Sequence, residues 1–217
     1  MAKKTDKTKT DNENIISLKK TKMKLKDKIE SHRNQFIDMV CSVEMSIDSD
    51  EVNLEKWMEE LINELKRTRN NKNRMYFIGN GASSSMSSHF ATDFTKNGGI
   101  SSFSCNEGTL LTCFGNDFGY ENAYMQMMNY YMQPGDVLVA ISSSGASKNI
   151  VNAINFVRQK FPDNVVITFT GFDANNYSRT NGNYNLYIPI KDYGMVESSH
   201  AYYLHMLLDF FIHQSTL

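Results

Sequence analysis

One order of segments occurs twice in this chain of 217 residues: a short apolar run, a loop rich in glycine or serine, and a helical pattern. The first apolar run, residues 75–78, is followed by GNGASSS at 79–85. The second, DVLVAI at 136–141, is followed by SSSGAS at 142–147. Continuous apolar runs are typical of strands buried on both faces, as in a parallel sheet covered by helices. Ligands bind outside the carboxyl ends of such strands, where we expect both loops.

The rest of the chain supplies more strands and the covering helices. NVVITFT at 164–170 and YNLYIPI at 184–190 are two further apolar runs. Residues 29–68 carry apolar residues at spacings of three and four, which predicts two amphipathic helices separated by a turn in SIDSDEVNLE at 46–55. We therefore expect an α/β fold, a three-layer sandwich with a central, mostly parallel sheet preceded by N-terminal helices. These helices have more apolar surface than one small sheet covers, which predicts a homo-oligomer.

The first 30 residues differ in charge from the rest of the chain. They contain ten lysines and five acidic residues, a net charge of +5, whereas the whole chain carries −1 and the remainder therefore −6. They also contain few large apolar residues, so they cannot build a core. We interpret residues 1–30 as a basic, disordered tail and residues 31–217 as one folded domain. The acidic residues within the tail, and its lack of arginine and aromatic residues, argue against nucleic acid as a partner.

The cysteines and the hydropathy pattern indicate the compartment. Cys41, Cys105 and Cys113 are odd in number and lack a C-x-x-C spacing, which argues against a disulfide scaffold or a structural zinc module. We therefore expect reduced thiols and a cytoplasmic location. No apolar stretch approaches the ~18 residues that cross a bilayer, so we expect no membrane partner.

The loop at 142–147 has the composition of a phosphate site. Serine hydroxyls, a glycine that permits tight curvature and the free N–H groups of a helix N-terminus can hold a phosphate dianion. Ordinary turn and capping chemistry is the alternative interpretation of such a loop. The loop at 79–85 lacks the third glycine of a dinucleotide fingerprint, and no G-x-x-x-x-G-K-[ST] motif occurs, so we expect a small phosphate ester and no organic cofactor.

Two pairs of titratable residues accompany these loops. His89 and Asp93 are four residues apart on the helix after the first loop, and Glu197 and His205 are eight apart on a C-terminal helix, so each pair shares a helix face. A carboxylate and an imidazole on opposite sides of an acyclic sugar could move a proton between adjacent carbons through an enediol. The same four side chains could instead ligate Zn²⁺, and the two roles are not exclusive. For each pair alone, a solvated polar face is the ordinary alternative.

Four segments in this order resemble the sugar isomerase (SIS) domain family and, within it, the bacterial phosphoheptose isomerases. They are GNGASSSMSSHFATDF at 79–94, CFGNDFGYE at 113–121, ISSSGASKNIVNAI at 141–154 and VESSHAYYLH at 196–205. The resemblance spans residues 33–215. It implies an aldose-ketose isomerase that converts sedoheptulose 7-phosphate to D-glycero-D-manno-heptose 7-phosphate for surface polysaccharide, and a homotetramer.

Carried over position by position, the resemblance also implies roles for individual residues. Asp93 and His205 stand at the positions of the catalytic carboxylate and histidine. The metal ligands of zinc-binding members match His89, Asp93, Glu197 and His205. The positions that line the sugar match Asn80, Gly81, Ala82, Ser83, Asn116, Asp117 and Glu197. The positions that hold the phosphate match Ser142, Ser143, Ser144 and Ser147.

The chain departs from the phosphoheptose isomerase pattern at two of these positions. Asp93 replaces a glutamate, which withdraws the carboxylate by about 1 Å, and Glu197 replaces a glutamine, which adds a negative charge that favours a cation. A non-catalytic SIS module that binds a phosphosugar is the competing hypothesis. Such modules often lack the acid-base pair, so the presence of both Asp93 and His205 favours the isomerase.

Overall fold

The computed structural model describes residues 24–213, and these divide into two units between Asp38 and Met39. Helix α2 (Leu25–Cys41) begins in the first unit. Residues 25–30, which we assigned to the tail, are helical in α2. The prediction of disorder for residues 1–23 concerns positions outside the described range.

Seven strands form one sheet within the described residues, in the order β2-β1-β7-β6-β5-β3-β4. The five strands from β4 to β7 along this order run parallel, and β1 and β2 are antiparallel to their neighbours. This arrangement confirms the expected α/β fold with a mostly parallel sheet. The strand bounds are β1 Glu44–Ile47, β2 Asp50–Val52, β3 Met75–Gly79, β4 Ser102–Ser104, β5 Val137–Ser142, β6 Val165–Gly171 and β7 Tyr184–Ile188.

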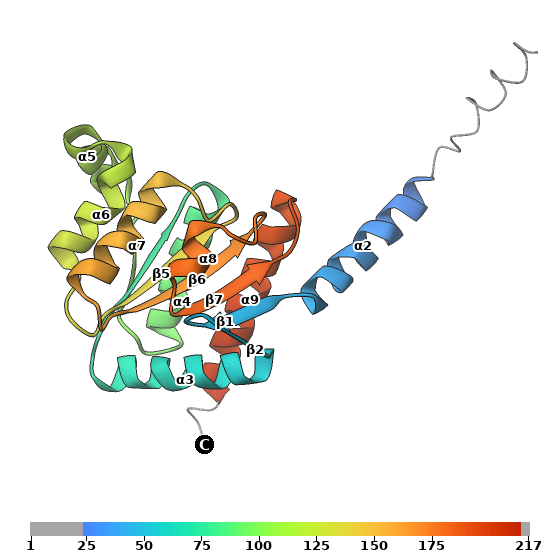
Figure 1. The fold of residues 1–217 in the computed structure, drawn as a ribbon, viewed down its shortest axis with the longest axis horizontal. Helices are drawn as coiled ribbons and strands as arrows, with labels where there is room; N and C mark the ends of the chain where they lie inside the picture. The colour runs from blue at the N-terminus through green and yellow to red at the C-terminus, as the bar shows by residue number, and fades with distance from the viewer. Residues whose placement is uncertain (1–23, 214–217) are drawn as a thin grey trace, which may run out of the picture. The chain divides into compact units, whose positions relative to one another are not determined.

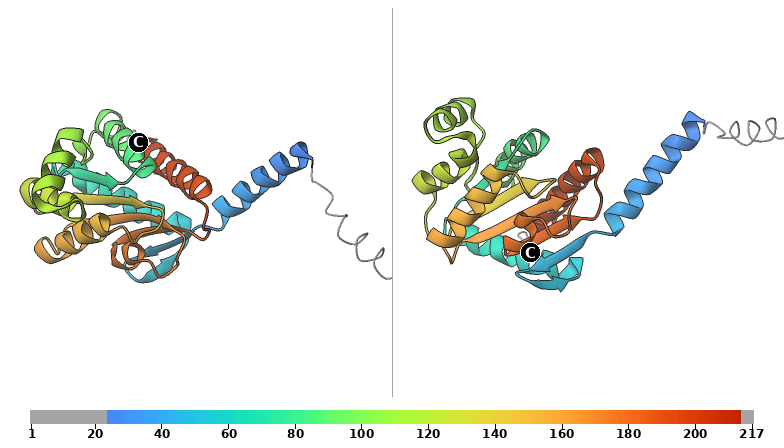
Figure 2. Two further views of the ribbon diagram at one scale, coloured as in Figure 1. Left: turned by 90° about the horizontal axis from the view of Figure 1, so that it is seen from above. Right: turned by 45° about the horizontal axis from the view of Figure 1, so that its top comes forward.

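Helices cover both faces of this sheet, as Figures 1 and 2 show. On one face, α6 and α7 pack on Tyr76, Leu138 and Val166. On the other, α4 packs on the sheet through Phe94, whose ring lies 5.8 Å from that of Phe77, and α3 and α9 lie on the same side. The helix bounds are α3 Leu54–Asn70, α4 Ala82–Lys96, α5 Gly108–Phe118, α6 Tyr120–Tyr131, α7 Lys148–Lys160, α8 Tyr177–Asn181 and α9 Tyr193–His213. No helix among the described residues is both long and apolar enough to cross a bilayer.

The segment between the two N-terminal helices contains the predicted turn, at residues 48–49, but the residues on either side of that turn are strands, which we did not predict. It forms the hairpin β1–β2, which extends the sheet beyond β7. Asp48 turns the hairpin in a left-handed conformation (φ 51°), which aspartate tolerates better than most residues. The Asn185 amide of β7 donates to Ser46 Oγ (3.1 Å) and to the Asp48 carbonyl (3.3 Å), so the polar residues that suggested a loop bind the neighbouring strand.

Helix α3 shows how local signals and packing agree in this fold. The Asn53 side chain accepts a hydrogen bond from the Lys56 N–H (2.9 Å) and so caps the helix N-terminus. One turn later Trp57 is fully buried, edge-on to Phe169 of β6 at 6.2 Å between ring centroids. Burial of a large apolar side chain stabilises a fold by about 2–3 kcal/mol, which fixes α3 against the sheet.

Candidate active site

The first glycine-rich loop leads directly from β3 into α4. Gly79 ends the strand so close to the next turn that a Cβ on it would lie 2.6 Å from the Ser83 carbonyl group. Gly81 has φ 56° and precedes Ala82, the first residue of α4. Ala82 is exposed, whereas Ser83 is buried with its N–H bonded to the Asn80 carbonyl (3.1 Å). The loop therefore has no room for a side chain at Gly79, needs a left-handed backbone at Gly81, and presents the start of α4 to solvent.

The serine loop leads from β5 into α7 in the same manner. Gly145 has φ 60°, and a Cβ on it would fall 1.8 Å from Asn176 Oδ1, so only glycine fits this turn. Ser142 Oγ accepts from the Gly145 N–H (3.2 Å), and Ser144 Oγ accepts from the Ala146 N–H (3.3 Å).

Two hydroxyls of this loop are not used to close it. Ser143 Oγ is buried and has no hydrogen-bond partner in the described part of the chain. Ser147 is the N-cap residue of α7, yet its side chain makes no capping hydrogen bond. An orphaned buried hydroxyl costs free energy unless a ligand or water meets it. Ser142 and Ser144 only accept within the loop, so all four serine hydroxyls keep an O–H to donate to an anion.

The two loops lie side by side at the carboxyl edge of the sheet. Strands β3 and β5 are parallel neighbours, with Gly79 paired to Ile141. A pair of side-chain amides joins the loops across this edge: Asn80 Nδ2 donates to Asn149 Oδ1 (3.0 Å), and Asn149 Nδ2 donates to Asn80 Oδ1 (2.9 Å). The predicted ligand loops therefore meet, as the strand order requires.

His89, Asp93 and His205 form one cluster that spans α4 and α9. One ligand atom from each lies within 4.8 Å of those from the other two. His89 Nε2 is 3.3 Å from Asp93 Oδ2, and the His89 and His205 rings are 5.2 Å apart between centroids. Buried Phe90 supports both imidazoles, with ring distances of 4.9 Å and 4.8 Å. The structure therefore brings together His89 and Asp93, which share a face of α4, and His205 from α9.

This cluster is open to solvent: 53% of the His89 side chain and 22% of the Asp93 side chain are exposed. The ligand-capable atoms of Asp93 and His205 are at most 4.8 Å apart, so a sugar cannot lie between them. An atom that lies about 3 Å from both Asp93 and His205 cannot lie on the line between them and must lie to one side of it. The expectation that they flank the sugar on opposite sides is therefore wrong within one chain, because both reach a ligand from the same side.

Glu197 and His200 also lie on α9 but do not join the cluster. Glu197 is half-buried and is not among the residues whose ligand atoms converge within 4.8 Å. His200 is fully buried, with Nε2 3.0 Å from the Thr170 carbonyl oxygen. Burial lowers the pKa of His200 to about 4, so its ring is neutral and ties α9 to the end of β6.

Asn116 and Asp117 were predicted to line the sugar, but the chain places them on α5. Both are exposed. Asn116 Nδ2 donates to Asp117 Oδ1 (3.0 Å), and Cys113 Sγ lies 3.9 Å from Asp117 Oδ2. Within the described residues these contacts join them to α5 itself rather than to the His89 cluster.

Sequence reasoning missed two tyrosines that bind the first loop. Tyr120 OH donates to Asn80 Oδ1 (2.8 Å), and Tyr124 OH donates to the Gly79 carbonyl (2.5 Å). Both stand on α6, four residues apart. Tyr120 lies within the segment CFGNDFGYE, so the motif marked the region, but no periodicity or spacing indicates which residue a tyrosine hydroxyl meets.

Comparison with known proteins places this geometry in a family. The sequence pattern of the SIS domain matches residues 42–171, which is more than half of the chain. The chain belongs to the SIS domain family. The matched residues contain the two loops and the parallel strands β3, β4, β5 and β6, and they begin close to the residue where the second compact unit starts.

Curated relatives of this SIS domain protein are isomerases. A phosphoheptose isomerase of Bordetella avium is 31% identical over 145 residues, which cover 64% of this chain and 74% of that protein. Phosphoheptose isomerase 2 of Campylobacter jejuni is 37% identical over 103 residues, 45% of this chain and about half (51%) of that protein. The solved phosphoheptose isomerase of Neisseria gonorrhoeae shares the fold, with a TM-score of 0.72, 23% identity, and coverage of 87% of this chain and 99% of that one. The family and the enzyme class expected from the sequence, an isomerase, are confirmed.

Proposed function

We propose that this chain is a phosphosugar isomerase that converts sedoheptulose 7-phosphate to D-glycero-D-manno-heptose 7-phosphate for heptose and surface polysaccharide biosynthesis. The observation that carries the proposal is the convergence of Asp93 and His205 in an SIS domain whose helix α4 carries Asp93 and begins at the glycine-rich loop. A SIS module that only bound a phosphosugar would have no need for a carboxylate and an imidazole within reach of one atom. The names of the relatives supply the substrate class.

In this proposal the chain's own groups perform three tasks. The serine loop, Ser142 to Ser147, holds the phosphate through its hydroxyls and the N-terminus of α7. The glycine-rich loop, Asn80 to Ser83, contacts the sugar, and the predicted contacts from Asn116, Asp117 and Glu197 complete that part of the site. Asp93 and His205 then move the proton, one group acting on the carbon and the other on the neighbouring oxygen, so that an enediol forms and collapses to the aldose.

Zn²⁺ fits the same cluster by donor chemistry. Two imidazoles and one carboxylate, His89, Asp93 and His205, are a donor set typical of catalytic zinc. A bound zinc ion would act as a Lewis acid on the sugar's oxygen atoms. Glu197, two turns before His205 on α9, is the fourth ligand that the family resemblance predicts.

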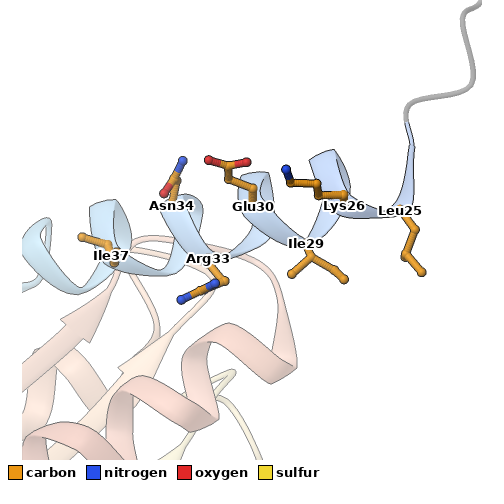
Figure 3. Close-up of a pocket in the computed structure, with 7 residues that line it drawn as sticks. All are labelled: Leu25, Lys26, Ile29, Glu30, Arg33, Asn34 and Ile37. Atoms are coloured by element: carbon orange, nitrogen blue, oxygen red, sulfur yellow. The ribbon is translucent and has the colours of Figure 1, made fainter.

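Further copies of the chain complete the proposed assembly, a homotetramer. Figure 3 shows residues of α2 that border a groove along this one helix. Three of its apolar residues are strongly exposed: Leu25 by 72%, Ile29 by 51% and Ile37 by 59%. An amphipathic helix with an uncovered apolar stripe gains stability when another helix buries that stripe. We propose a cytoplasmic enzyme, in keeping with three free cysteines and a phosphorylated substrate.

Turnover of sedoheptulose 7-phosphate, with and without added zinc, tests the proposal. We expect the wild-type chain to convert the substrate. Asp93→Asn should lower kcat by about 10²–10⁴-fold, because an amide cannot exchange the proton. Asp163→Asn, an exposed carboxylate in the turn before β6, is the matched control and should retain full activity. No turnover by the wild type, or full activity of Asp93→Asn, would contradict the proposal; binding without turnover would favour the non-catalytic module.

A further inference from the structure

The carboxamide of Asn80 is held by three hydrogen bonds to two other side chains. Its Oδ1 accepts from Asn149 Nδ2 (2.9 Å) and from Tyr120 OH (2.8 Å), and its Nδ2 donates to Asn149 Oδ1 (3.0 Å). An amide oxygen has two acceptor sites and an amide nitrogen two hydrogens. Both acceptor sites of Asn80 are thus occupied, and one N–H remains for a ligand. Asn80 can meet a bound sugar as a hydrogen-bond donor only.

The partners of Asn80 are themselves firmly placed. Asn149 is 3% exposed in the first turn of α7, and its Oδ1 also accepts from the Ile150 N–H (3.0 Å). Tyr120 opens α6, directly after Gly119 at φ 81°. One turn further, the buried hydroxyl of Tyr124 donates to the Gly79 carbonyl, so α6 holds two consecutive residues of the loop. The glycine-rich loop is therefore bound on one side by α6 and on the other by α7.

The two helices are also joined to each other at the same end. Asn152, one turn after Asn149, donates through Nδ2 to the Glu121 carbonyl (2.9 Å) and to Asn122 Oδ1 (3.1 Å). These bonds close a ring of polar contacts from the glycine-rich loop through α6 and α7 and back. The serine loop enters α7 only two residues before Asn149, so this ring fixes the distance between the two ligand loops.

We propose that Asn149 and Tyr120 are positioning residues of the isomerase reaction, an inference that rests on the proposed function. They hold the Asn80 amide with one N–H facing the ligand, and they set the spacing between the loop that contacts the sugar and the loop that holds the phosphate. A phosphosugar touches both loops at once, whereas inorganic phosphate touches the serine loop alone. Loss of the Asn80–Asn149–Tyr120 network therefore weakens binding of the whole substrate and leaves phosphate binding intact.

Steady-state kinetics with two probes separate this role from a merely structural one. Tyr120→Phe removes one hydroxyl from a residue that is 53% exposed, so it should fold normally. We expect its KM for sedoheptulose 7-phosphate to rise about fivefold, the effect of one lost hydrogen bond, while kcat changes less than twofold. The inhibition constant of inorganic phosphate should stay within twofold of the wild-type value. Asn149→Ala should raise KM by about tenfold or more.

The double variant tests whether both residues act through Asn80. We expect the KM of Tyr120→Phe combined with Asn149→Ala to rise by clearly less than the product of the single effects, because the second change finds Asn80 already released. Tyr130→Phe on the same helix, 61% exposed and without a hydroxyl hydrogen bond among the described residues, is the control and should match wild type.

Other outcomes would overturn the positioning role, or the proposed function together with it. A wild-type KM in Tyr120→Phe would refute the positioning role while the proposed function stands. Equally weakened binding of phosphate and of sugar phosphate in both variants would do the same. A drop in melting temperature without a change in KM would show that the network is only structural. A wild-type chain that neither binds nor converts the sugar phosphate would refute the proposed function, and the positioning role with it.

Discussion

His200 makes the fold sensitive to acid in a way that can be measured. Its ring is fully buried on α9, and the Thr170 carbonyl oxygen is 3.0 Å from Nε2. The ring faces Phe169, at 6.0 Å between centroids, and no carboxylate approaches it among the described hydrogen bonds and ion pairs. Desolvation therefore lowers the pKa of His200 from 6.5 to about 4.

The size and sign of the effect follow from proton linkage. Because the pKa in the folded chain is lower than in the unfolded chain, the unfolded state takes up the proton first as the pH falls. The contribution of His200 to stability is thus fully present above about pH 7.5 and is lost progressively towards pH 4. A difference of about 2.5 between the two pKa values corresponds to about 3.4 kcal/mol in full, of which about 2 kcal/mol is lost by pH 5.

Urea unfolding of the wild type and of His200→Gln at pH 7.5, 6 and 5, at one protein concentration, measures this contribution. The glutamine amide can still donate to the Thr170 carbonyl but does not titrate. We expect the fall in unfolding free energy between pH 7.5 and pH 5 to be smaller in His200→Gln by about 2 kcal/mol. His32→Gln, which replaces an exposed histidine, should show the wild-type fall. Equal pH dependence in wild type and His200→Gln would refute the reasoning.

Further predictions concern the serine loop, the metal cluster and the thiols. Gly145→Ala should destabilise the fold by about 2–3 kcal/mol in urea unfolding, since φ is 60° and no space exists for a methyl group, whereas Gly108→Ala, with nothing within 4 Å, should cost less than about 0.5 kcal/mol. His89→Ala should weaken zinc binding in calorimetry by more than tenfold; wild-type zinc affinity in Glu197→Ala would show that Glu197 is not a ligand. Burial raises the pKa of Cys105 to about 12, so iodoacetamide at pH 8 should label the two exposed cysteines and spare Cys105 until the chain unfolds.

The parallel core could be predicted from the sequence because each of its longer strands is a continuous apolar run. Strands β3, β5, β6 and β7 lie within one or two residues of the expected ranges. The hairpin β1–β2 could not, because its strands are three and four residues long and half polar, and they become strands only through hydrogen bonds to β7. Local composition indicates only the turn at residues 48–49, and tertiary pairing makes strands of the residues beside it.

The site shows the same division between local and tertiary information. His89 and Asp93 share a helix face at spacing four, so their pairing could be predicted from the sequence alone. Their approach to His205 depends on how α4 packs on α9, which only the family resemblance indicated. The contact between Tyr120 and Asn80 joins residues 40 apart through side-chain orientation, for which the sequence holds no periodic signal.

The most direct test of the account is the fate of the substrate's carbon-bound hydrogen in heavy water. If Asp93 and His205, whose cluster is open to solvent, transfer the proton through an enediol, conversion of sedoheptulose 7-phosphate in D₂O should place deuterium on carbon 2 of the aldose, as seen by NMR. Asp93→Asn should slow this incorporation together with turnover. Product formed at the wild-type rate with no deuterium at that carbon would contradict the enediol mechanism and the roles assigned to Asp93 and His205.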